Sequence, residues 1–458
     1  MSARTRAIWM SMRYLQNSFA PINRLPPEVL GLIPSSFRSK RDLISATAVC
    51  RHWRNTLLAS PDLWCDVDCS GSLGPLREHM FQECLRRSGS VPLNVRLTSV
   101  RYLPDITPHL PRFGSLDVRL TVPEQLGKIA AHFSQPSPLL QKLSISAAPP
   151  WDQTILSIPP TLFGGQLEAL RTLRLTGFLT LKIPYHFPQL TRFDLQTRGS
   201  LSFKVDGMLK ILERMPLLEV LHIKFRPSHH PPTSFPSTSR LVTLPNLKEV
   251  ELSSSDDLCV IPPCIPPLLF ALTLPSVKRI AIGMLPPLGS TALPNSFEEQ
   301  LPNFAETTTV DIYVGLGVFN VLFHGRQGSR LLLFTNYCGV RPQFEREGFR
   351  GTPFSTVKKL VVTVERFSPG VREDFFELVR AMERLKYLEL RGRCARQVLS
   401  LWSEKSRHDQ QTICPSLRSV VVVKRPNDPV PNTLAELENA RKSHGVPLIE
   451  GAKVVHDL

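Results

Sequence analysis

The sequence predicts an α plus α/β protein, in which a small module of three helices is followed by an irregular α/β solenoid with a curved parallel sheet. Three observations support this fold class. Apolar residues recur at helical spacing over residues 22–68. From about residue 113 onward, one short apolar pattern returns at intervals of about 28 residues. The 42 prolines are scattered without a period, which favours many short elements over long helices.

Composition and charge define the broad class of protein but not its ligand. With 42% hydrophobic and 21% charged residues, the chain is typical of folded globular proteins and unlike a wholly disordered, collagen-like or membrane-embedded chain. Fifty-five Lys and Arg against 39 Asp and Glu give a net charge of +16. Such a charge favours acidic partners, but it does not choose among an acidic protein, a nucleic acid and a phosphorylated ligand.

The cysteines and the N-terminal residues bear on the compartment. The nine cysteines contain no C-x-x-C pair, so neither a disulfide framework nor a zinc cluster is expected, and reduced thiols are the simplest interpretation. Residues 1–21 lack the apolar core of a signal peptide, and no run approaches about 18 apolar residues. We therefore expect no membrane span and a location in the cytoplasm, the nucleus or both.

The N-terminal module contains start and stop signals for three short helices. The first helix begins at the Pro-Pro pair 26–27, because proline fits the first helical turn, and it ends at Pro34. The second begins at Ser39, a capping residue. The third carries Trp53 and stops at Pro61. Three short helices bury little surface alone, so we expect some of their apolar residues to contact a partner.

The residues of this module follow the order L-P-x-E-h-h-x-x-I, then D-L-h-x-A-x-x-V-C-x-x-W-R and a closing L-W, where h is apolar. This order resembles the F-box family. The matching residues are Leu25, Pro26, Glu28, Val29, Leu30, Ile33, Asp42, Leu43, Ala46, Val49, Cys50, Trp53, Arg54, Leu63 and Trp64. In that family the module docks on the Skp-type adaptor of SCF (Skp, cullin, F-box) ubiquitin ligases, while the rest of the chain binds the protein to be ubiquitinated.

The resemblance implies roles for individual residues. The positions expected to bind the adaptor, or to form the core behind that contact, are Leu25, Pro26, Leu30, Ile33, Leu43, Val49 and Trp53. Trp64 matches the closing tryptophan that packs the module onto the next part of the chain. An ordinary three-helix packing unit without an adaptor is the alternative. Cys50 is not expected to be a nucleophile, because no histidine and acidic partner can be identified for it.

The segment after the module is expected to be ordered. Residues 75–87 predict one amphipathic helix with Phe81, Cys84 and Leu85 on one face, and with Gly89 beyond its end. The VPLNVRL segment after this helix is a predicted capping strand. We therefore expect the helix and the strand to join the module rigidly to the solenoid.

The repeated pattern is an apolar residue, two spacers, an apolar residue, one spacer and a third apolar residue. Its middle residue stands at positions 116, 143, 173, 193, 221, 250, 280, 310, 331, 360, 388 and 420. Each copy is expected to supply one strand, with its apolar residues in the core and the residue between the last two on the concave face. The pattern resembles the irregular leucine-rich repeats that commonly follow fungal F-boxes.

Two features depart from the regular leucine-rich repeat. The Asn or Cys that ties the turns of the regular family together is missing at the matching positions, which hold residues such as Ala148 and Phe178. Residues 318–334 predict two alternating strands around Gly325 and Gly328, which is a hairpin rather than a strand-helix unit. An unrelated mixed fold is the alternative for this part of the chain.

The spacer positions of the strands are the predicted binding surface. The residues expected to bind a protein target are Arg174, Arg192, His222, Lys224, Glu251, Arg279, Tyr313, Tyr387 and Arg391. Asp194, Glu249, Asp311 and Glu389 are expected on the same face. This mixture of signs with two aromatic residues suits a protein surface better than a uniformly basic nucleic-acid groove, so nucleic acid is the less favoured ligand.

No enzyme signature is found. A G-x-S-x-G, a P-loop, an H-E-x-x-H and a G-x-G-x-x-G motif are all absent from the sequence, and no cofactor is expected. His229 and His230, in the proline-rich insert 226–239, are interpreted as a loop rather than a metal pair. The start of a calcium loop at Asp66 is interpreted as a surface turn, because its twelfth position is Arg77.

The predicted organisation is an N-terminal extension (1–20), an F-box (21–68), a linking helix with the leucine-rich-repeat-like solenoid (69–425) and a C-terminal tail (426–458). The predicted function is substrate recognition in an SCF-type ubiquitin ligase. The partners would be a Skp-type adaptor, a cullin reached through the adaptor, and an unknown target protein. The alternatives are an F-box scaffold not linked to ubiquitination and a basic solenoid that binds nucleic acid or a phosphorylated ligand.

Overall fold

The structure of the protein is a computed structural model. The structure describes residues 3–33, 37, 40–69, 75–122, 124–147, 158–178, 183–197, 205–225, 240–254, 265–283, 297–315, 318–336, 353–365, 375–376, 379–393, 395–408, 414–424, 439, 442 and 451–456. Two compact units are present. The first unit comprises Met1–Ala148 and Pro159–Ala169, and the second comprises Pro149–Ile158 and Leu170–Leu458.

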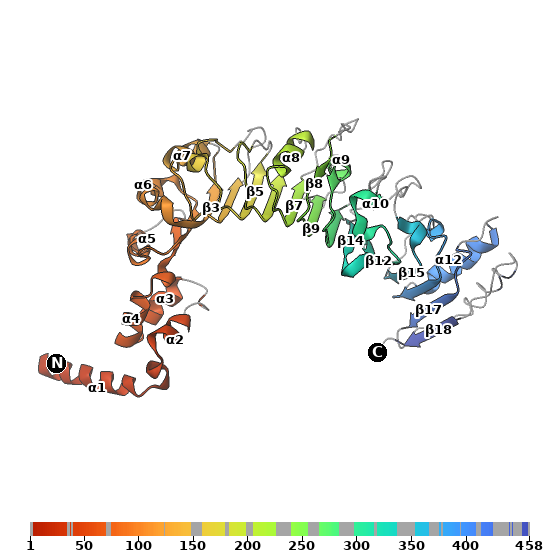
Figure 1. Ribbon diagram of the computed structural model, residues 1–458. Helices are drawn as coiled ribbons and strands as arrows, with labels where there is room; N and C mark the ends of the chain where they lie inside the picture. Colours follow the sequence, from red (N-terminus) through yellow and green to blue (C-terminus); the bar gives the residue numbers. More distant parts are fainter. Residues whose placement is uncertain are drawn as a thin grey trace. The chain divides into compact units, whose positions relative to one another are not determined.

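The first unit begins with short helices (Figure 1). They are α1 (Ala3–Ser18), η1 (Pro21–Arg24), α2 (Pro27–Leu32), α3 (Lys40–Thr47), α4 (Arg51–Leu58) and η3 (Pro61–Trp64). Helices α2, α3 and α4 coincide with the three predicted helices, within the residues that the structure describes. Helix α1 was not predicted, because the high overall proline content conceals the fact that residues 3–18 contain neither proline nor glycine. No described helix is both long enough and apolar enough to cross a membrane.

The rest of the first unit alternates strands with short helices. The elements are β1 (Asp66–Cys69), α5 (Pro75–Arg87), β2 (Leu93–Leu97), η4 (Val100–Tyr102), α6 (Leu103–Ile106), η5 (Thr107–Arg112), β3 (Phe113–Leu120), α7 (Glu124–His132), β4 (Lys142–Ala147) and η6 (Leu162–Gly165). Strands β1 to β4 pair in parallel in chain order. The predicted helix over 75–87 is confirmed as α5, and Gly89 after it has a φ of +51°.

Strand β1 corrects the interpretation of its residues as a surface turn. Asp66 to Cys69 pair in register with Asn94 to Leu97 of β2. Val67 and Cys69 are buried while the two aspartates face solvent. A strand of four residues shows the alternation of buried and exposed side chains only twice. So short a pattern does not distinguish a strand from a surface turn in the sequence alone.

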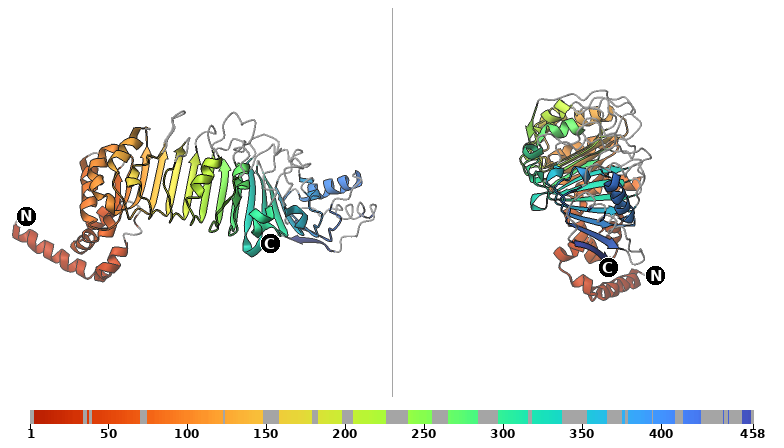
Figure 2. Two further views of the ribbon diagram at one scale, coloured as in Figure 1. Left: turned by 45° about the horizontal axis from the view of Figure 1, so that its top comes forward. Right: turned by 90° about the vertical axis from the view of Figure 1, so that its right-hand side faces the viewer.

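The second unit is built on one large sheet and a separate two-stranded sheet. The strands of the large sheet are β5 (Thr172–Phe178), β6 (Arg192–Thr197), β7 (Val220–Phe225), β9 (Glu249–Ser254), β11 (Arg279–Gly283), β12 (Thr309–Gly315), β13 (Val318–His324), β14 (Arg330–Asn336), β15 (Lys359–Val364), β16 (Tyr387–Arg391), β17 (Ser419–Lys424) and β18 (Gly451–His456). The small sheet pairs β8 (Val242–Thr243) with β10 (Leu272–Thr273). Figure 2 shows the large-sheet strands side by side, from yellow through green to blue.

Short helices lie in the connections of the second unit. They are α8 (Val205–Leu212), α9 (Ile265–Phe270), α10 (Phe297–Gln300), η7 (Pro302–Phe304), η8 (Arg326–Gly328), η10 (Pro353–Thr356) and α12 (Ala395–His408). Helix α8 is typical, since Met208, Leu209 and Leu212 are all buried. The protein is therefore a mixed helix and sheet structure in which parallel pairing dominates.

The apolar repeat marks the core of both units. Each of the twelve middle residues of the repeated pattern lies in a strand, and none is more than 2% exposed. Burial alternates along these strands, so that Leu221 and Ile223 of β7 are buried while His222 between them is half-buried. The predicted strand positions and the alternation of their side chains are confirmed.

The predicted hairpin over 318–334 is also confirmed, and it alters the order of the sheet. Strand β13 pairs antiparallel with both β12 and β14. As a result β11 pairs with β14, and β12 pairs with β15, so the order is β11-β14-β13-β12-β15. The large sheet is therefore parallel except at β13, whose two neighbours both run opposite to it, as the predicted hairpin requires.

The C-terminal tail contributes more than the sequence suggested. Strand β18 pairs in parallel with β17 over Gly451 to His456, so part of the tail belongs to the sheet. The predicted helix near 432–443 lies outside the described residues, apart from residues 439 and 442. The insert 226–239, with His229 and His230, lies outside them as well.

Candidate protein-interaction surfaces

A hydrogen bond between a tryptophan and an asparagine connects α4 of the helical module with η1. Trp53 of α4 is buried, and its indole Nε1 donates a hydrogen bond of 2.9 Å to Oδ1 of Asn23 in η1. Asn23 Nδ2 in turn donates to the Asn17 carbonyl oxygen at 2.7 Å. A buried indole N–H needs such an acceptor, so this contact fixes the position of η1 beside α4.

A second tryptophan joins the end of the module to the next helix. Trp64 is buried, and its Nε1 donates to the Leu57 carbonyl oxygen at 2.9 Å. The guanidinium of Arg87, from α5, lies 5.3 Å from the centre of the Trp64 ring. Lys40 Nζ donates to the Leu63 carbonyl oxygen at 2.6 Å. The contacts place the closing tryptophan between the module and α5, as the sequence predicted.

Several apolar side chains of the module face solvent. Leu32, after the buried Leu30 of α2, is 68% exposed, and Val49 after α3 is 60% exposed. Val29 of α2 and Ile44 of α3 are also exposed. Four exposed apolar side chains on so small a module leave apolar surface that a protein partner could cover.

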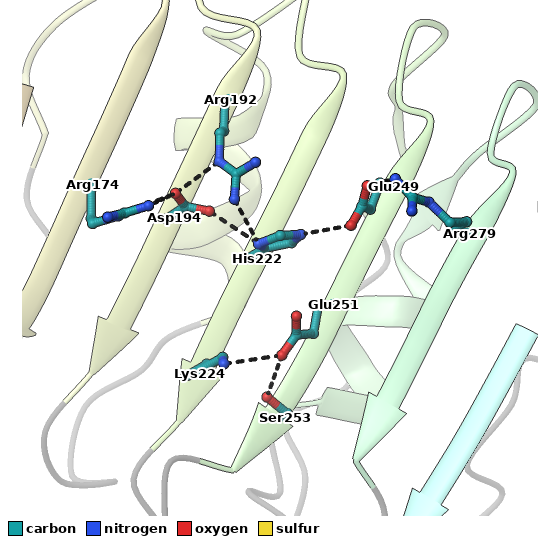
Figure 3. A network of polar contacts seen from close by, with 9 residues as sticks. All are labelled: Arg174, Arg192, Asp194, His222, Lys224, Glu249, Glu251, Ser253 and Arg279. Carbon is teal, nitrogen blue, oxygen red and sulfur yellow. Dashed lines mark hydrogen bonds and ion pairs between the residues drawn. The ribbon is translucent and has the colours of Figure 1, made fainter. Parts of the chain in front are cut away.

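A set of charged and polar side chains occupies the solvent-facing side of strands β5 to β11 in the second unit (Figure 3). We call it the polar network. Its members are Arg174, Arg192, Asp194, His222, Lys224, Glu249, Glu251, Ser253 and Arg279. The strand register brings them together, because Arg174, Asp194, His222 and Glu251 stand opposite one another on four neighbouring strands.

Asp194 is the centre of one half of the polar network. Its Oδ2 accepts hydrogen bonds from Arg192 Nε at 2.9 Å and from Arg174 Nη2 at 3.1 Å. Its Oδ1 lies 3.1 Å from His222 Nδ1. Burial raises the pKa of Asp194, but the contacts from His222, Arg192 and Arg174 outweigh burial and hold the pKa well below its usual value. Asp194 is therefore a carboxylate at any ordinary pH.

His222 connects the two halves of the polar network. Its Nε2 lies 3.2 Å from Glu249 Oε1, while its Nδ1 faces both Asp194 Oδ1 and, at 3.2 Å, Arg192 Nη2. A protonated ring donates to both carboxylates, whereas a neutral ring with a bare Nδ1 accepts from Arg192 and leaves Asp194 Oδ1 without that donor. Contact with Asp194, and then with Glu249, raises the pKa of His222 despite its burial. Folding therefore stabilises the protonated form of the ring.

The other half of the polar network contains two further ion pairs. Arg279 of β11 pairs with Glu249 of β9. Lys224 Nζ lies 3.2 Å from Glu251 Oε1, to which Ser253 Oγ donates at 3.3 Å. Each carboxylate of the polar network therefore contacts at least one cationic side chain.

The carboxylates and the cations lie at different depths. The carboxylate side chains are shielded, with exposed fractions of 13% for Asp194, 26% for Glu249 and 28% for Glu251. The arginines reach further out, with 57% for Arg174 and 69% for Arg279. A partner that approaches this face therefore meets cationic groups first.

One comparison with known proteins bears on the helical module. Residues 22–70 match the F-box-like family model. The match runs from η1 through β1, and it includes both tryptophans described above and the exposed apolar residues. No curated protein matches the chain. The chain therefore contains an F-box-like domain, and F-box domains generally bind Skp-type adaptors within SCF ubiquitin ligases.

Burial divides the predicted adaptor-binding residues of the F-box-like domain. Leu30, Leu43 and Trp53 belong to its core. The others reach the surface, and they are Leu25, Pro26, Ile33 and Val49. Leu32 and Ile44 are exposed apolar residues that were not among the predicted adaptor-binding positions. The family pattern has an apolar position at 44, and both side chains lie on helix faces opposite buried residues, which could have indicated them. The adaptor contacts of all these residues stay predictions.

The predicted target-binding residues fall into two groups. Six of them join the polar network, and they are Arg174, Arg192, His222, Lys224, Glu251 and Arg279. Tyr313 of β12 and Tyr387 of β16 are exposed on later strands, and Arg391 Nε donates to Glu389 Oε1 at 2.8 Å. Asp194 and Glu249 hold the first group together. The sequence placed both on this face but did not select them as site residues.

The described residues contain no group of three or more His, Cys, Asp or Glu that could hold a metal ion. Burial raises the pKa of the Cys69 and Cys84 thiols, which keeps them protonated at neutral pH. Both side chains pack in the core of the first unit.

Proposed function

We propose that this protein recruits a target protein to an SCF-type ubiquitin ligase. The F-box-like domain would dock on a Skp-type adaptor, which links it to a cullin, and the solvent-facing side of the second-unit sheet would bind the target. The observation that carries the proposal is the F-box-like match over residues 22–70, together with the apolar residues that this domain leaves exposed.

The mechanism in this proposal is positioning rather than chemistry. A target held on the second unit reacts with ubiquitin delivered by the ligase at a high effective concentration, as in an intramolecular reaction. The packing of Trp64 between the F-box-like domain and α5 supports the proposal, because it fixes the direction in which the chain leaves the adaptor-binding module.

The test is a titration of the full chain with a purified Skp-type adaptor. The variant Leu32→Asp/Val49→Asp places two charges on the exposed apolar surface of the F-box-like domain. We expect its affinity for the adaptor to fall by roughly 30-fold or more, since charges in a desolvated interface core are costly. The matched control Leu217→Asp/Leu241→Asp changes two exposed leucines of the second unit and should bind as wild type does.

The outcomes separate the proposal from its rivals. Equal affinity of wild type and the Leu32→Asp/Val49→Asp variant would remove this surface from the adaptor interface. Recovery of adaptor and cullin without ubiquitin transfer to any co-purified protein would favour the scaffold. Binding to RNA that falls steeply between about 50 and 200 mM salt, with no protein target, would favour the nucleic-acid alternative.

A further inference from the structure

We infer that the sheet face over β7 to β14 binds an acidic segment of a protein, in which an apolar side chain stands a few residues from a cluster of Asp or Glu. The inference rests on the proposed function, because it names the class of target that the second unit would recruit. It uses the polar network and the neighbouring residues of β13 and β14.

Charge is layered on this face, with carboxylates below cations. The three carboxylates of the polar network are shielded below the guanidinium and ammonium groups, and each already contacts a cation. A guanidinium has five N–H donors, and the contact of Arg279 with Glu249 uses only one Nη of Arg279. The outer surface therefore offers donors that match carboxylate oxygens.

Two arginines stand in register on neighbouring strands of this face. Arg279 of β11 stands opposite Arg330 of β14, and Arg330 is exposed. Among the residues that the structure describes, Arg330 forms no ion pair. Like charges opposite one another on neighbouring strands are unfavourable. Glu249 contacts Arg279 from the β9 side only, so the β14 side, where the two arginines meet, is suited to an external carboxylate.

An apolar patch lies next to these arginines. Ala281, Leu332 and Leu322 stand opposite one another on β11, β14 and β13, and all three are half-buried. Side chains two residues apart on a strand share a face, so Arg279 and Ala281, like Arg330 and Leu332, point the same way. Cationic and apolar surface therefore lie side by side.

The geometry sets the spacing within the bound segment. Two residues along a strand span about 7 Å, and three steps between neighbouring strands, from β7 to β14, span about 14 Å. An extended peptide covers these distances with roughly two to four residues. An acidic cluster over the arginines would thus place an apolar side chain two to four residues away over the patch.

Nucleic acid fits this face less well than an acidic peptide. Nucleic-acid sites track many regularly spaced phosphates with continuous positive charge. Here the carboxylates alternate with the cations, and the apolar patch interrupts the charged surface after β11. Polar groups beside an apolar centre are the usual composition of a protein interface.

The experiment is a fluorescence-polarisation titration of the full chain with synthetic peptides. The probe is a labelled peptide with three consecutive Glu and one Leu three residues further on. We expect it to bind, and we expect affinity to fall by about tenfold when its Glu residues are replaced by Gln, and by several-fold when its Leu is replaced by Ser.

The protein variants locate the site. Arg279→Gln/Arg330→Gln should reduce probe affinity by about tenfold, and Leu332→Ser by several-fold. The matched control Arg384→Gln/Arg418→Gln removes the same charge from exposed positions of the second unit outside the polar network, and it should stay within about twofold of wild type. Thermal unfolding of each variant checks that the fold is retained.

Three outcomes would overturn the inference. They are equal binding of the Glu and Gln probes, equal loss in the control variant, and binding of a phosphoserine or RNA probe when the Glu probe does not bind. Adaptor affinity is measured on the same variants. If the labelled Glu peptide does not bind, while these variants bind the adaptor and a co-purifying target as wild type does, the acidic-segment inference is wrong and the proposed function stands.

Discussion

At the scale of single residues, His222 shows how the strand register creates an environment that no local sequence motif contains. Its two ring nitrogens face carboxylates from β6 and β9, which lie 28 residues before and 27 residues after it in the chain. Charged and titratable groups also face it from Arg192 on β6 and Glu251 on β9. The ring is therefore stabilised as a cation by residues that only folding brings together.

The variant His222→Gln tests this arrangement. Because the pKa of His222 is raised on folding, its stabilising contribution is complete below the unfolded pKa of about 6.5 and is lost as the pH rises through the folded value. We expect wild type to exceed His222→Gln in unfolding free energy by on the order of 1 kcal/mol at pH 5.5, and by less at pH 8.5. The measurement is urea denaturation at both pH values.

His109 provides a control of opposite sign. Burial, and then the charge of Arg112, lowers its pKa, so the folded state loses stability as the pH falls below the unfolded value. The stability of wild type relative to His109→Gln should therefore decrease on acidification. Parallel pH trends for the two variants would contradict the assignment of His222 as a stabilised cation.

A second prediction at this scale concerns Asn23. Asn23→Ala removes the acceptor of the buried Trp53 N–H, and we expect it to lower the stability of the first unit by about 1–3 kcal/mol. Asn17→Ala is the matched control, because only the backbone oxygen of Asn17 takes part in the contact with Asn23. The shift in tryptophan fluorescence on urea unfolding gives the measurement. Equal effects of the two substitutions would show that the Trp53 contact contributes little.

At the scale of elements, tight turns between strands depend on glycine at defined positions. Gly392, after β16, has a φ of +86°, and a Cβ there would lie 2.5 Å from the Val364 carbonyl oxygen. Gly328, next to β14, has a φ of +76° but no atom within 4 Å of such a Cβ. The two glycines share the left-handed backbone and differ in the space around it.

Substituting alanine at both positions separates strain from steric contact. We expect Gly328→Ala to cost about 1 kcal/mol for the left-handed conformation, and Gly392→Ala to cost roughly 1–2 kcal/mol more, because the β16 turn must move away from Val364. Thermal unfolding of the two variants gives the comparison. A smaller loss at Gly392 than at Gly328 would contradict this description of the turn.

The elements that the sequence predicted are those whose signal is local. The repeated apolar pattern located twelve strands, and the proline and capping signals located α2, α3 and α4. These features depend on residues that are close together in the sequence, because a buried face and a helix end are each determined within a few positions. The pairing of β11 with β14 was not predicted, since it depends on contacts between residues about 50 positions apart. For the same reason the sequence placed Asp194 and His222 on one face without showing that they touch.

At the scale of the whole molecule, the chain combines two compact units, and the proposed tasks fall in different ones. The F-box-like domain lies in the first unit and the polar network in the second. Repeated strands stack against their immediate neighbours, so damage to one strand is expected to spread to adjacent strands before it reaches a different unit.

Leu221→Asp tests this independence. Leu221 of β7 is fully buried, and a charge there is expected to unfold the surrounding strands while adaptor binding by the F-box-like domain is unchanged. Gln196→Asp, on the exposed side of β6, is the matched control and should leave the protease pattern of wild type unaltered. Limited proteolysis should give new cuts between residues 190 and 250 in the Leu221→Asp variant alone. Loss of adaptor binding in that variant would contradict independent units.

The inverted order β11-β14-β13-β12 has a consequence for the nascent chain on the ribosome. In a regular array, each new strand meets the edge left by the strand before it. Here β11 ends at Gly283, and the strand that covers its edge begins at Arg330. At translation speeds of about 5–20 residues per second, the edge of β11 stays unpaired for roughly 2–10 s before β14 begins to emerge. During that time chaperones can bind the exposed edge, and other chains can pair with it. Vectorial assembly of the sheet therefore pauses at β11 until the three-stranded meander has emerged.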